Sequence, residues 1–80
     1  MRKRQKRLVN YIIAERKRRN IQQQKLARRL RQHQSWVSRL ESGQRRIDVC
    51  EFLDLAEAIG FDPYMALRKI QGESRTRRHV

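Results

Sequence analysis

The stretch from Gln23 to Gly43 constrains this chain more than any other part of its sequence. It divides into two short segments, 23–30 and 34–42, in which apolar residues recur at intervals of three and four. These residues are Leu26, Ala27 and Leu30 in the first segment, and Val37 and Leu40 in the second. Because such spacing places side chains on one side of a helix, the stretch predicts two short helices that share a core and meet at a sharp angle.

The opposite side of the segment 34–42 carries polar side chains, with an indole at its edge. They are Gln34, Ser35, Ser38 and Arg39, flanked by Trp36. Amides and guanidinium groups form paired hydrogen bonds with base edges, and hydroxyls form single ones. We therefore predict a helix-turn-helix that lays its second helix in the DNA major groove, with these five residues as candidates for base readout. Two interpretations of Trp36 stay open: contact with a thymine methyl or sugar, and packing against the helix 23–30 or the chain near Arg31.

The charge of the chain is unevenly placed and predicts a polyanionic partner. The net charge is +13, with 16 basic and 2 acidic residues in 1–46 but 2 basic and 5 acidic residues in 47–70. A generic solubilising surface would mix both signs, so we expect the basic half to bind nucleic acid. The candidates for phosphate contacts are His33, Arg28, Arg31, Ser42, Arg45 and Arg46.

Capping residues predict the remaining helices. A helix over 8–19 ends at Asn20, which tolerates the left-handed conformation. A helix over 49–59 begins after Asp48, which forms a capping-box pattern with Glu51, and ends at Gly60. Its apolar residues at helical spacing are Val49, Phe52, Leu53, Ala56 and Ile59. A last helix begins at Asp62-Pro63 and ends at Gly72.

These elements predict one small all-α domain. The basic residues 1–7 are expected to form a frayed helix start or an arm, residues 8–72 the folded domain, and residues 73–80 a flexible basic tail. No stretch approaches the ~20 apolar residues of a membrane span. The single cysteine, Cys50, is expected to be a small buried hydrophobe and suits a reducing cytoplasm. We therefore expect a cytoplasmic, nucleoid-associated protein that is not in a membrane.

The pattern resembles the lambda-repressor-like helix-turn-helix domains of phage repressors, Cro proteins and small bacterial regulators. The matching segments are IQQQKLA from Ile21, QSWVSRLESG from Gln34 and IDVCEFLDLAEAIGFDP from Ile47, within residues 8–70. The resemblance implies a five-helix bundle whose second and third helices form the reading unit. This chain departs from the family pattern at Arg31, where glycine is usual, at Gln32, where a small apolar residue is frequent, and at Trp36, where a small or polar residue is usual.

The resemblance also implies roles for individual residues. Gln23 corresponds to a glutamine that binds a phosphate and braces the first residue of the reading helix, and Gln34 is that residue, which hydrogen-bonds an adenine in the phage repressors. Arg16 and Glu41 correspond to a largely buried ion pair, so we expect them to meet. Family members form two-fold dimers, and the candidate dimer residues here are Tyr64, Met65, Leu67 and Ile70.

The predicted function is that of a sequence-specific, double-stranded DNA-binding transcriptional regulator of the repressor type. The alternative is an antitoxin or co-regulator of the same fold whose main partner is another protein. An RNA binder is disfavoured, because the chain has neither an RNP aromatic pair nor a GXXG loop. We predict no enzyme activity and no cofactor, since no catalytic carboxylate pair or phosphate-binding glycine loop is visible. We predict no metal either, because the only other histidine besides His33 is in the tail.

Overall fold

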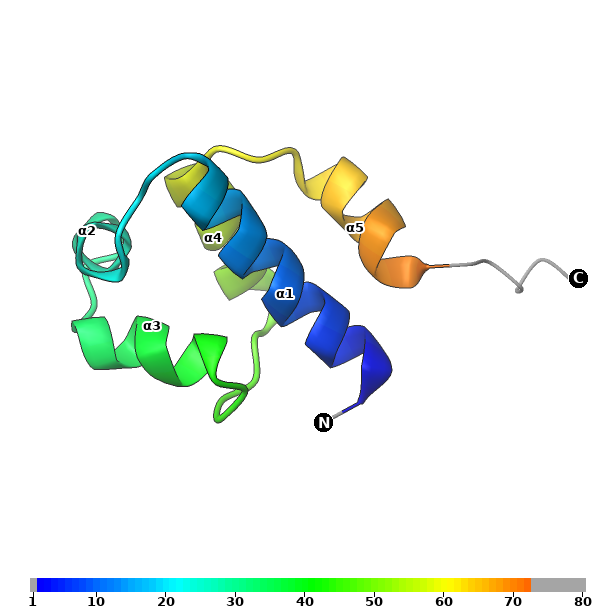
Figure 1. The fold of residues 1–80 in the computed structure, drawn as a ribbon, viewed down its shortest axis with the longest axis horizontal. Coiled ribbons are helices and arrows are strands. Elements are labelled where there is room, and N and C mark those ends of the chain that lie inside the picture. Colours follow the sequence, from blue (N-terminus) through cyan, green and yellow to red (C-terminus); the bar gives the residue numbers. More distant parts are fainter. Residues whose placement is uncertain (1, 73–80) are drawn as a thin grey trace, which may run out of the picture.

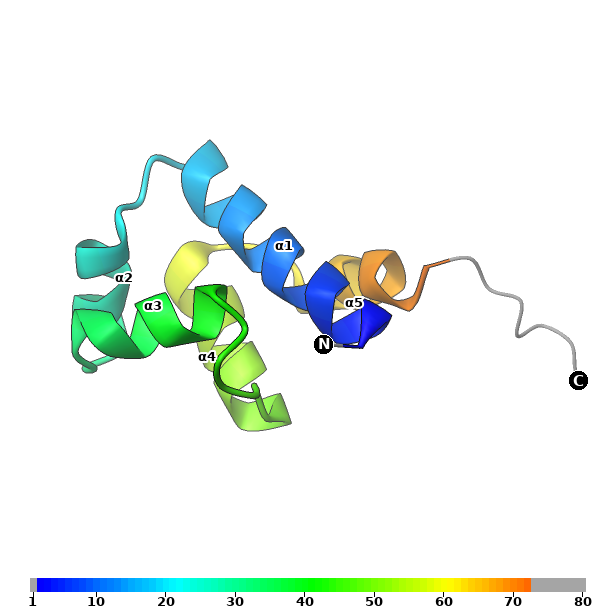
Figure 2. The same cartoon turned by 60° about the horizontal axis from the view of Figure 1, so that its bottom comes forward.

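The computed structural model describes residues 2–72, and this part of the chain is all-α, as predicted. Its helices are α1 (Lys3–Arg18), α2 (Gln23–Arg29), α3 (Gln34–Glu41), α4 (Val49–Ile59) and α5 (Pro63–Gln71). Both views show α2 and α3 at one end of the bundle and α5 at the other, with α1 running between the two ends (Figures 1 and 2). The predicted tail, 73–80, lies outside the described residues.

A single core holds all five helices together. Ile12 of α1, Leu26 of α2 and Val37 and Leu40 of α3 have no exposed surface, and neither does Leu55 of α4. Burying side chains of this size contributes about 1.5–3 kcal/mol each relative to leaving them exposed. The apolar sides of α2 and α3 predicted from the sequence therefore face this core.

Helix α1 begins earlier than predicted. Its first residue is Lys3, so residues 3–7 form its first turns, which agrees with a helix start and not with an arm. Lysine, arginine and glutamine are good helix formers, and a tertiary contact offsets part of their mutual repulsion. Arg7 donates from Nη1 to the carbonyl oxygens of Ile70 and Gln71, each at 3.3 Å, at the C-terminus of α5. The basic start of α1 is thereby packed along α5.

The turn between α2 and α3 keeps a closed geometry although it lacks glycine. Arg31 adopts a left-handed φ of 57°, and the Gln32 N–H donates to the carbonyl of Ala27 at 2.9 Å. The same arrangement ends α1 at Asn20 and α3 at Gly43, as the sequence predicted for these two residues. The left-handed conformation costs most residues with a Cβ roughly 1–2 kcal/mol, whereas glycine and, less often, asparagine adopt it as single residues, so Arg31 is the strained member of the three.

Helix α4 has the predicted bounds, and three of its five expected core residues, Phe52, Ala56 and Ile59, are buried. Asp48 accepts from the Glu51 N–H at 2.8 Å, and the Glu51 carboxylate accepts from the Asp48 N–H at 3.1 Å, which completes the capping box. The buried residues are Phe52, Leu55, Ala56 and Ile59. Val49 and Leu53, expected on the buried side, are 73% and 50% exposed. They lie at the edge of the apolar side, where no neighbouring helix covers them.

Two smaller predictions have different outcomes. Cys50 is exposed rather than buried, because it lies in the first turn of α4 on the solvent side. Across residues 2–72, no helix combines the length and apolarity that a membrane crossing needs.

Candidate nucleic-acid interface

Helix α3 turns its polar side to solvent. Gln34, Ser35 and Arg39 are exposed, while Val37 and Leu40 on the opposite side are fully buried. Ser38 is half-buried and leans towards α2. The exposed side chains therefore project from a helix whose orientation is fixed by its buried side.

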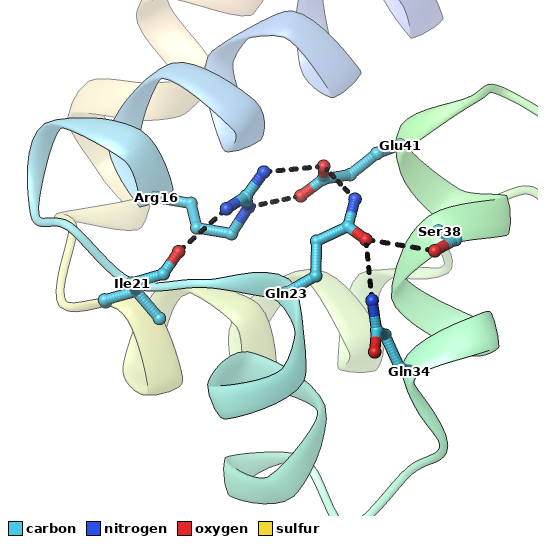
Figure 3. A network of polar contacts seen from close by, with 6 residues as sticks. All are labelled: Arg16, Ile21, Gln23, Gln34, Ser38 and Glu41. Carbon is cyan, nitrogen blue, oxygen red and sulfur yellow. Dashed lines mark hydrogen bonds and ion pairs between the residues drawn. The ribbon is translucent and has the colours of Figure 1, made fainter.

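A buried ion pair ties α1 to the end of α3 (Figure 3). Arg16 donates from Nε to Glu41 Oε2 at 2.6 Å and from Nη2 to Glu41 Oε1 at 2.9 Å. Its Nη1 donates to the carbonyl of Ile21 at 2.8 Å. The two side chains are only 9% and 7% exposed. The pair expected from the resemblance thus makes a bidentate contact, the geometry that best offsets the cost of burying two charges.

Gln23, the first residue of α2, extends this pair to the outer side of α3. Its Nε2 donates to Glu41 Oε1 at 2.9 Å, and its Oε1 accepts from Ser38 Oγ at 3.0 Å and from Gln34 Nε2 at 3.4 Å. Figure 3 shows the five polar side chains, Arg16, Glu41, Gln23, Ser38 and Gln34, as one continuous network. The contact between Gln23 and Gln34 that the resemblance implied is therefore present, and Ser38 joins it.

Trp36 lies beneath the loop that follows α3. The indole is half-buried against the core, and the guanidinium carbon of Arg45 is 4.5 Å from the centroid of its ring. Arg45 also donates from Nη1 and Nη2 to the two carboxylate oxygens of Glu51, at 3.2 and 3.0 Å. The structure gives Trp36 a packing partner, Arg45, that neither of the two interpretations named.

The Arg45–Glu51 pair also changes the titration of the carboxylate. The pKa of Glu51 is lowered, chiefly because Arg45 donates to it and secondarily because the Asp48 backbone N–H does. Arg45, predicted as a phosphate ligand, therefore has its charge balanced within the protein. Its neighbour Arg46 is exposed on the same loop.

The other phosphate candidates lie around the ends of α2 and α3. Arg28, Arg31, His33 and Ser42 are exposed, with the Ser42 hydroxyl donating to the Arg39 carbonyl at 3.1 Å. Within residues 2–72, no group of three or more potential metal-binding side chains gathers around His33 or elsewhere.

Several arginines serve the scaffold rather than an exposed surface. Arg19 Nη2 donates to the carbonyl of Gly60 at 2.9 Å, and Arg29 Nη1 donates to that of Ala58 at 2.7 Å. Both carbonyls end α4, which has no basic residue in its own last turn. Cations at a helix C-terminus are favourable. The charge count alone therefore overstates how many basic residues can meet a partner.

Comparison with known proteins places this geometry in a family. The model of the helix-turn-helix domain family matches residues 7–67. A solved structure, an XRE-family like protein from Pseudomonas syringae pv. tomato str. DC3000, is 41% identical, with a TM-score of 0.81 over 85% of this chain and 83% of that one. The chain belongs to the XRE family of helix-turn-helix domains. No curated protein sequence matches it. The resemblance to lambda-repressor-like domains is therefore confirmed, and the family membership indicates a DNA-binding regulator.

The side of this XRE-family domain formed by α4 and α5 differs from the helix-turn-helix in leaving large apolar side chains exposed. Val49, Tyr64 and Leu67 are 73%, 77% and 52% exposed and line a groove of about 290 Å³ that is floored by Phe52. Ile70, a further predicted dimer residue, also lines this groove, whereas Met65 is exposed beside it. Val49 and Leu53, which the sequence placed in the core, line this groove as well.

The residue that sequence reasoning assigned incompletely is Glu41. The resemblance implied its contact with Arg16 but gave no sign of its second contact, with Gln23. A carboxylate has more acceptor sites than one guanidinium fills. The acceptor sites that Arg16 leaves unfilled could have predicted a further donor from a neighbouring helix.

Proposed function

We propose that this protein is a sequence-specific, double-stranded DNA-binding transcriptional regulator of the repressor type, and that it reads the major groove with α3. The observation that carries the proposal is the division of α3: Val37 and Leu40 are fully buried, while Gln34, Ser35 and Arg39 project into solvent. A helix of this kind fits the width of the major groove. The protein acts by binding DNA and has no enzymatic role. It is located in the cytoplasm, bound to the nucleoid.

Base readout comes from the exposed side chains of α3. Gln34 offers an amide that pairs with adenine N6 and N7, and Arg39 offers a fork that pairs with guanine O6 and N7. Ser35 adds a single hydroxyl contact. Trp36 has one ring face against Arg45, so any contact with a thymine methyl comes from its remaining edge.

Phosphate contacts position the domain and supply its salt-dependent affinity. Basic and polar groups surround the reading helix on the α2 side and on the following loop; they are Gln23, Arg28, Arg31, His33, Ser42 and Arg46. Each phosphate that a basic side chain neutralises contributes roughly −0.9 to the slope of log affinity against log salt. Arg45 contacts Glu51 and Trp36 within the protein. Its role is therefore to fix the loop that carries Arg46.

A second copy of the chain covers the α4–α5 side. A single domain reads few base pairs, and XRE-type domains extend their site by two-fold pairing with half-sites ~34 Å apart. Exposed apolar surface of this kind is typical of an interaction site, and an isologous contact between identical grooves would bury Tyr64, Leu67 and Ile70. Another protein in the same groove is the alternative, as in an antitoxin, and co-purification of a stoichiometric partner with the native protein would favour it.

Selection of bound duplexes from a random pool tests the function. We expect the parent to select a short palindrome. Gln34→Ala should lose the preference at one base pair in each half-site while keeping most of its non-specific binding. The matched control is Gln24→Ala, which truncates an exposed glutamine on α2 and should select like the parent. A Gln34→Ala variant that selects the same sequences as the parent would show that α3 does not read the bases as proposed.

A further inference from the structure

A group of basic side chains lies outside the helix-turn-helix, at the start of α1. Arg2, Lys3 and Arg4 share a hollow of about 780 Å³ with Arg46, which comes from the loop that follows α3. We propose that these four residues, the basic patch, bind the DNA backbone between the two half-sites of a palindromic site. This inference rests on the proposed function, to which it adds a second contact surface and a second part of the DNA.

The charges of the basic patch are available to a partner. All four side chains are exposed. Across residues 2–72, the ion pairs are made by other arginines, namely Arg16, Arg18, Arg19 and Arg45. Cations gathered around one hollow without a carboxylate partner create a positive potential that attracts an extended polyanion. The closely spaced phosphates of a DNA strand are such a polyanion.

The basic patch lies on the same side of the molecule as the reading helix. Figure 1 shows α3, the loop that follows it and the start of α1 along the lower border, with α5 on the opposite border. Arg46 belongs to that loop and also lines the hollow with Arg2, Lys3 and Arg4. A duplex that receives α3 and reaches Arg46 therefore continues towards the start of α1. This continuity favours DNA over any other polyanion as the partner.

The position of the basic patch beside the apolar groove determines which phosphates it meets. The hollow and the groove on the α4–α5 side share three lining residues, Leu8, Ile47 and Ile70. A second copy of the chain covers that groove in the proposed function, so the basic patch lies next to the two-fold axis. The patches of the two protomers then face the stretch of DNA that separates the half-sites, which neither α3 contacts.

Tertiary contacts hold the start of α1 in place. Arg7 donates from Nη1 to the carbonyl oxygens of Ile70 and Gln71, each at 3.3 Å, and a Cβ at Gly72 would overlap its guanidinium group. A surface that is already ordered has less conformational entropy to lose on binding than an arm would. Residues 2–4 precede the region that the chain shares with its family, 7–67. The proposed contact is therefore an addition made by this chain's own first turn.

The first test measures how binding depends on salt. Lys3→Gln combined with Arg4→Gln removes two charges but keeps good helix formers, and the palindrome selected by the parent is the probe. We expect the slope of log affinity against log salt to become shallower by roughly 1.8, twice the contribution of one phosphate, with base preferences unchanged. The control, Arg68→Gln combined with Lys69→Gln, removes two exposed charges of α5 outside the hollow and should keep the parent's slope.

The second test locates the contact on the DNA. Uncharged methylphosphonate linkages replace phosphates either between the half-sites or at the outer ends of the palindrome. Central replacement should weaken binding of the parent and of the α5 control by on the order of tenfold. It should weaken the α1 double variant much less, because that variant no longer makes the contact. Outer replacement should affect all three proteins equally.

The outcomes separate this inference from the function on which it rests. Thermal melts show whether the double variant is folded, and Lys3→Gln alone, with half the expected change in slope, replaces it if not. A folded variant with the parent's salt slope would overturn the proposal, as would equal effects of central replacement on the parent and the double variant.

A membrane surface is tested with vesicles of phosphatidylserine and phosphatidylcholine. Vesicle binding that the double variant loses, together with an unchanged salt slope on DNA, would assign the basic patch to lipid and overturn the proposal. If the parent selects no sequence at all, the proposed function fails. A shallower slope of the double variant on a random duplex would then still support phosphate binding by the basic patch.

Discussion

The helix-turn-helix end of the molecule and its α4–α5 side expose side chains of opposite character. At the helix-turn-helix end, the exposed side chains of α3 are polar and charged, and Gln34 and Ser38 donate hydrogen bonds to Gln23 of α2. On the α4–α5 side, large apolar side chains such as Val49 and Tyr64 are exposed around a groove. The first surface suits a hydrated, charged partner, and the second suits a partner that excludes water.

The two surfaces also differ in what holds them. Charged pairs support the helix-turn-helix end, and the most important of them is buried between Arg16 and Glu41. The α4–α5 side is supported by packed apolar residues, among them Leu55 and Ala66, together with the Arg7 contact to the end of α5. A substitution of an exposed side chain on one surface should therefore leave the contacts of the other surface in place.

The largest expected effect comes from breaking the buried pair. Glu41→Gln leaves the Arg16 guanidinium buried without a charged partner, and the loss of such a partner typically costs about 3–5 kcal/mol. We expect the free energy of unfolding, measured by urea denaturation, to fall by this amount. The control is Glu57→Gln, which changes an exposed carboxylate on α4 and should leave stability within about 0.5 kcal/mol. An unchanged melting temperature for Glu41→Gln would show that the pair does not support the helix-turn-helix.

A substitution in the groove should affect stability less than Glu41→Gln does, but should strongly affect dimerisation. Tyr64 is 77% exposed, so Tyr64→Lys should change the unfolding free energy by only about 0.5 kcal/mol. By placing a charge in the shared apolar contact, it should shift sedimentation from dimer to monomer and weaken binding to a palindrome more than binding to one half-site. Asn10→Lys introduces the same charge at an exposed position of α1 outside the groove and is the control. A parent that sediments as a monomer both free and on DNA would remove the dimer from the account.

The smallest expected effect is a loss of thermal stability at low pH. The pKa of Glu51 is lowered by Arg45 and by the Asp48 N–H, and the pKa of Glu15 is lowered by Arg18 and Arg19. A depressed folded-state pKa contributes stability that is present above the unfolded value, about 4.3 for glutamate, and is lost as the pH falls through the folded value. We therefore expect melting temperatures to decline below about pH 4.3.

Glu51→Gln isolates one part of this acid response. Glutamine can still complete the capping box, so the variant removes the charge and spares the helix cap. The pH dependence should be shallower than in the parent, by about 1 kcal/mol or less for a partly exposed pair, whereas Glu57→Gln should follow the parent. A parent curve as flat as that of Glu51→Gln would contradict the role of the Arg45–Glu51 pair.

Much of the fold follows from local signals in the sequence. The bounds of α4 were predicted because Asp48, Glu51 and Gly60 mark its ends, and the starts of α2 and α3 were predicted from apolar spacing. The start of α1 was not, because local charge gave no sign of the Arg7 contact with the end of α5. Likewise, helical spacing allowed Leu53 to face the core, and only the placement of the neighbouring helices decides that it does not.

The candidate site shows the same limit. A sequence can identify Gln23, Gln34 and Ser38 as polar residues of a reading unit, but their hydrogen bonds depend on the angle between α2 and α3. Arg45 is the clearest example: as a basic residue in a loop it was assigned to phosphate, whereas the fold brings it onto Trp36 and against Glu51. Contacts between distant segments therefore decide which polar residues are available to a partner.

The central claim is that the helix-turn-helix end, and not the α4–α5 side, meets DNA. The most direct measurement is a titration of 15N-labelled protein with a selected duplex, followed by the backbone and side-chain amide resonances. We expect the largest chemical-shift changes at residues 33–39, including the side-chain amide of Gln34, and at Gln23 and Arg46. Largest shifts on α4 and α5 around Val49 and Tyr64, with α3 unchanged, would contradict it.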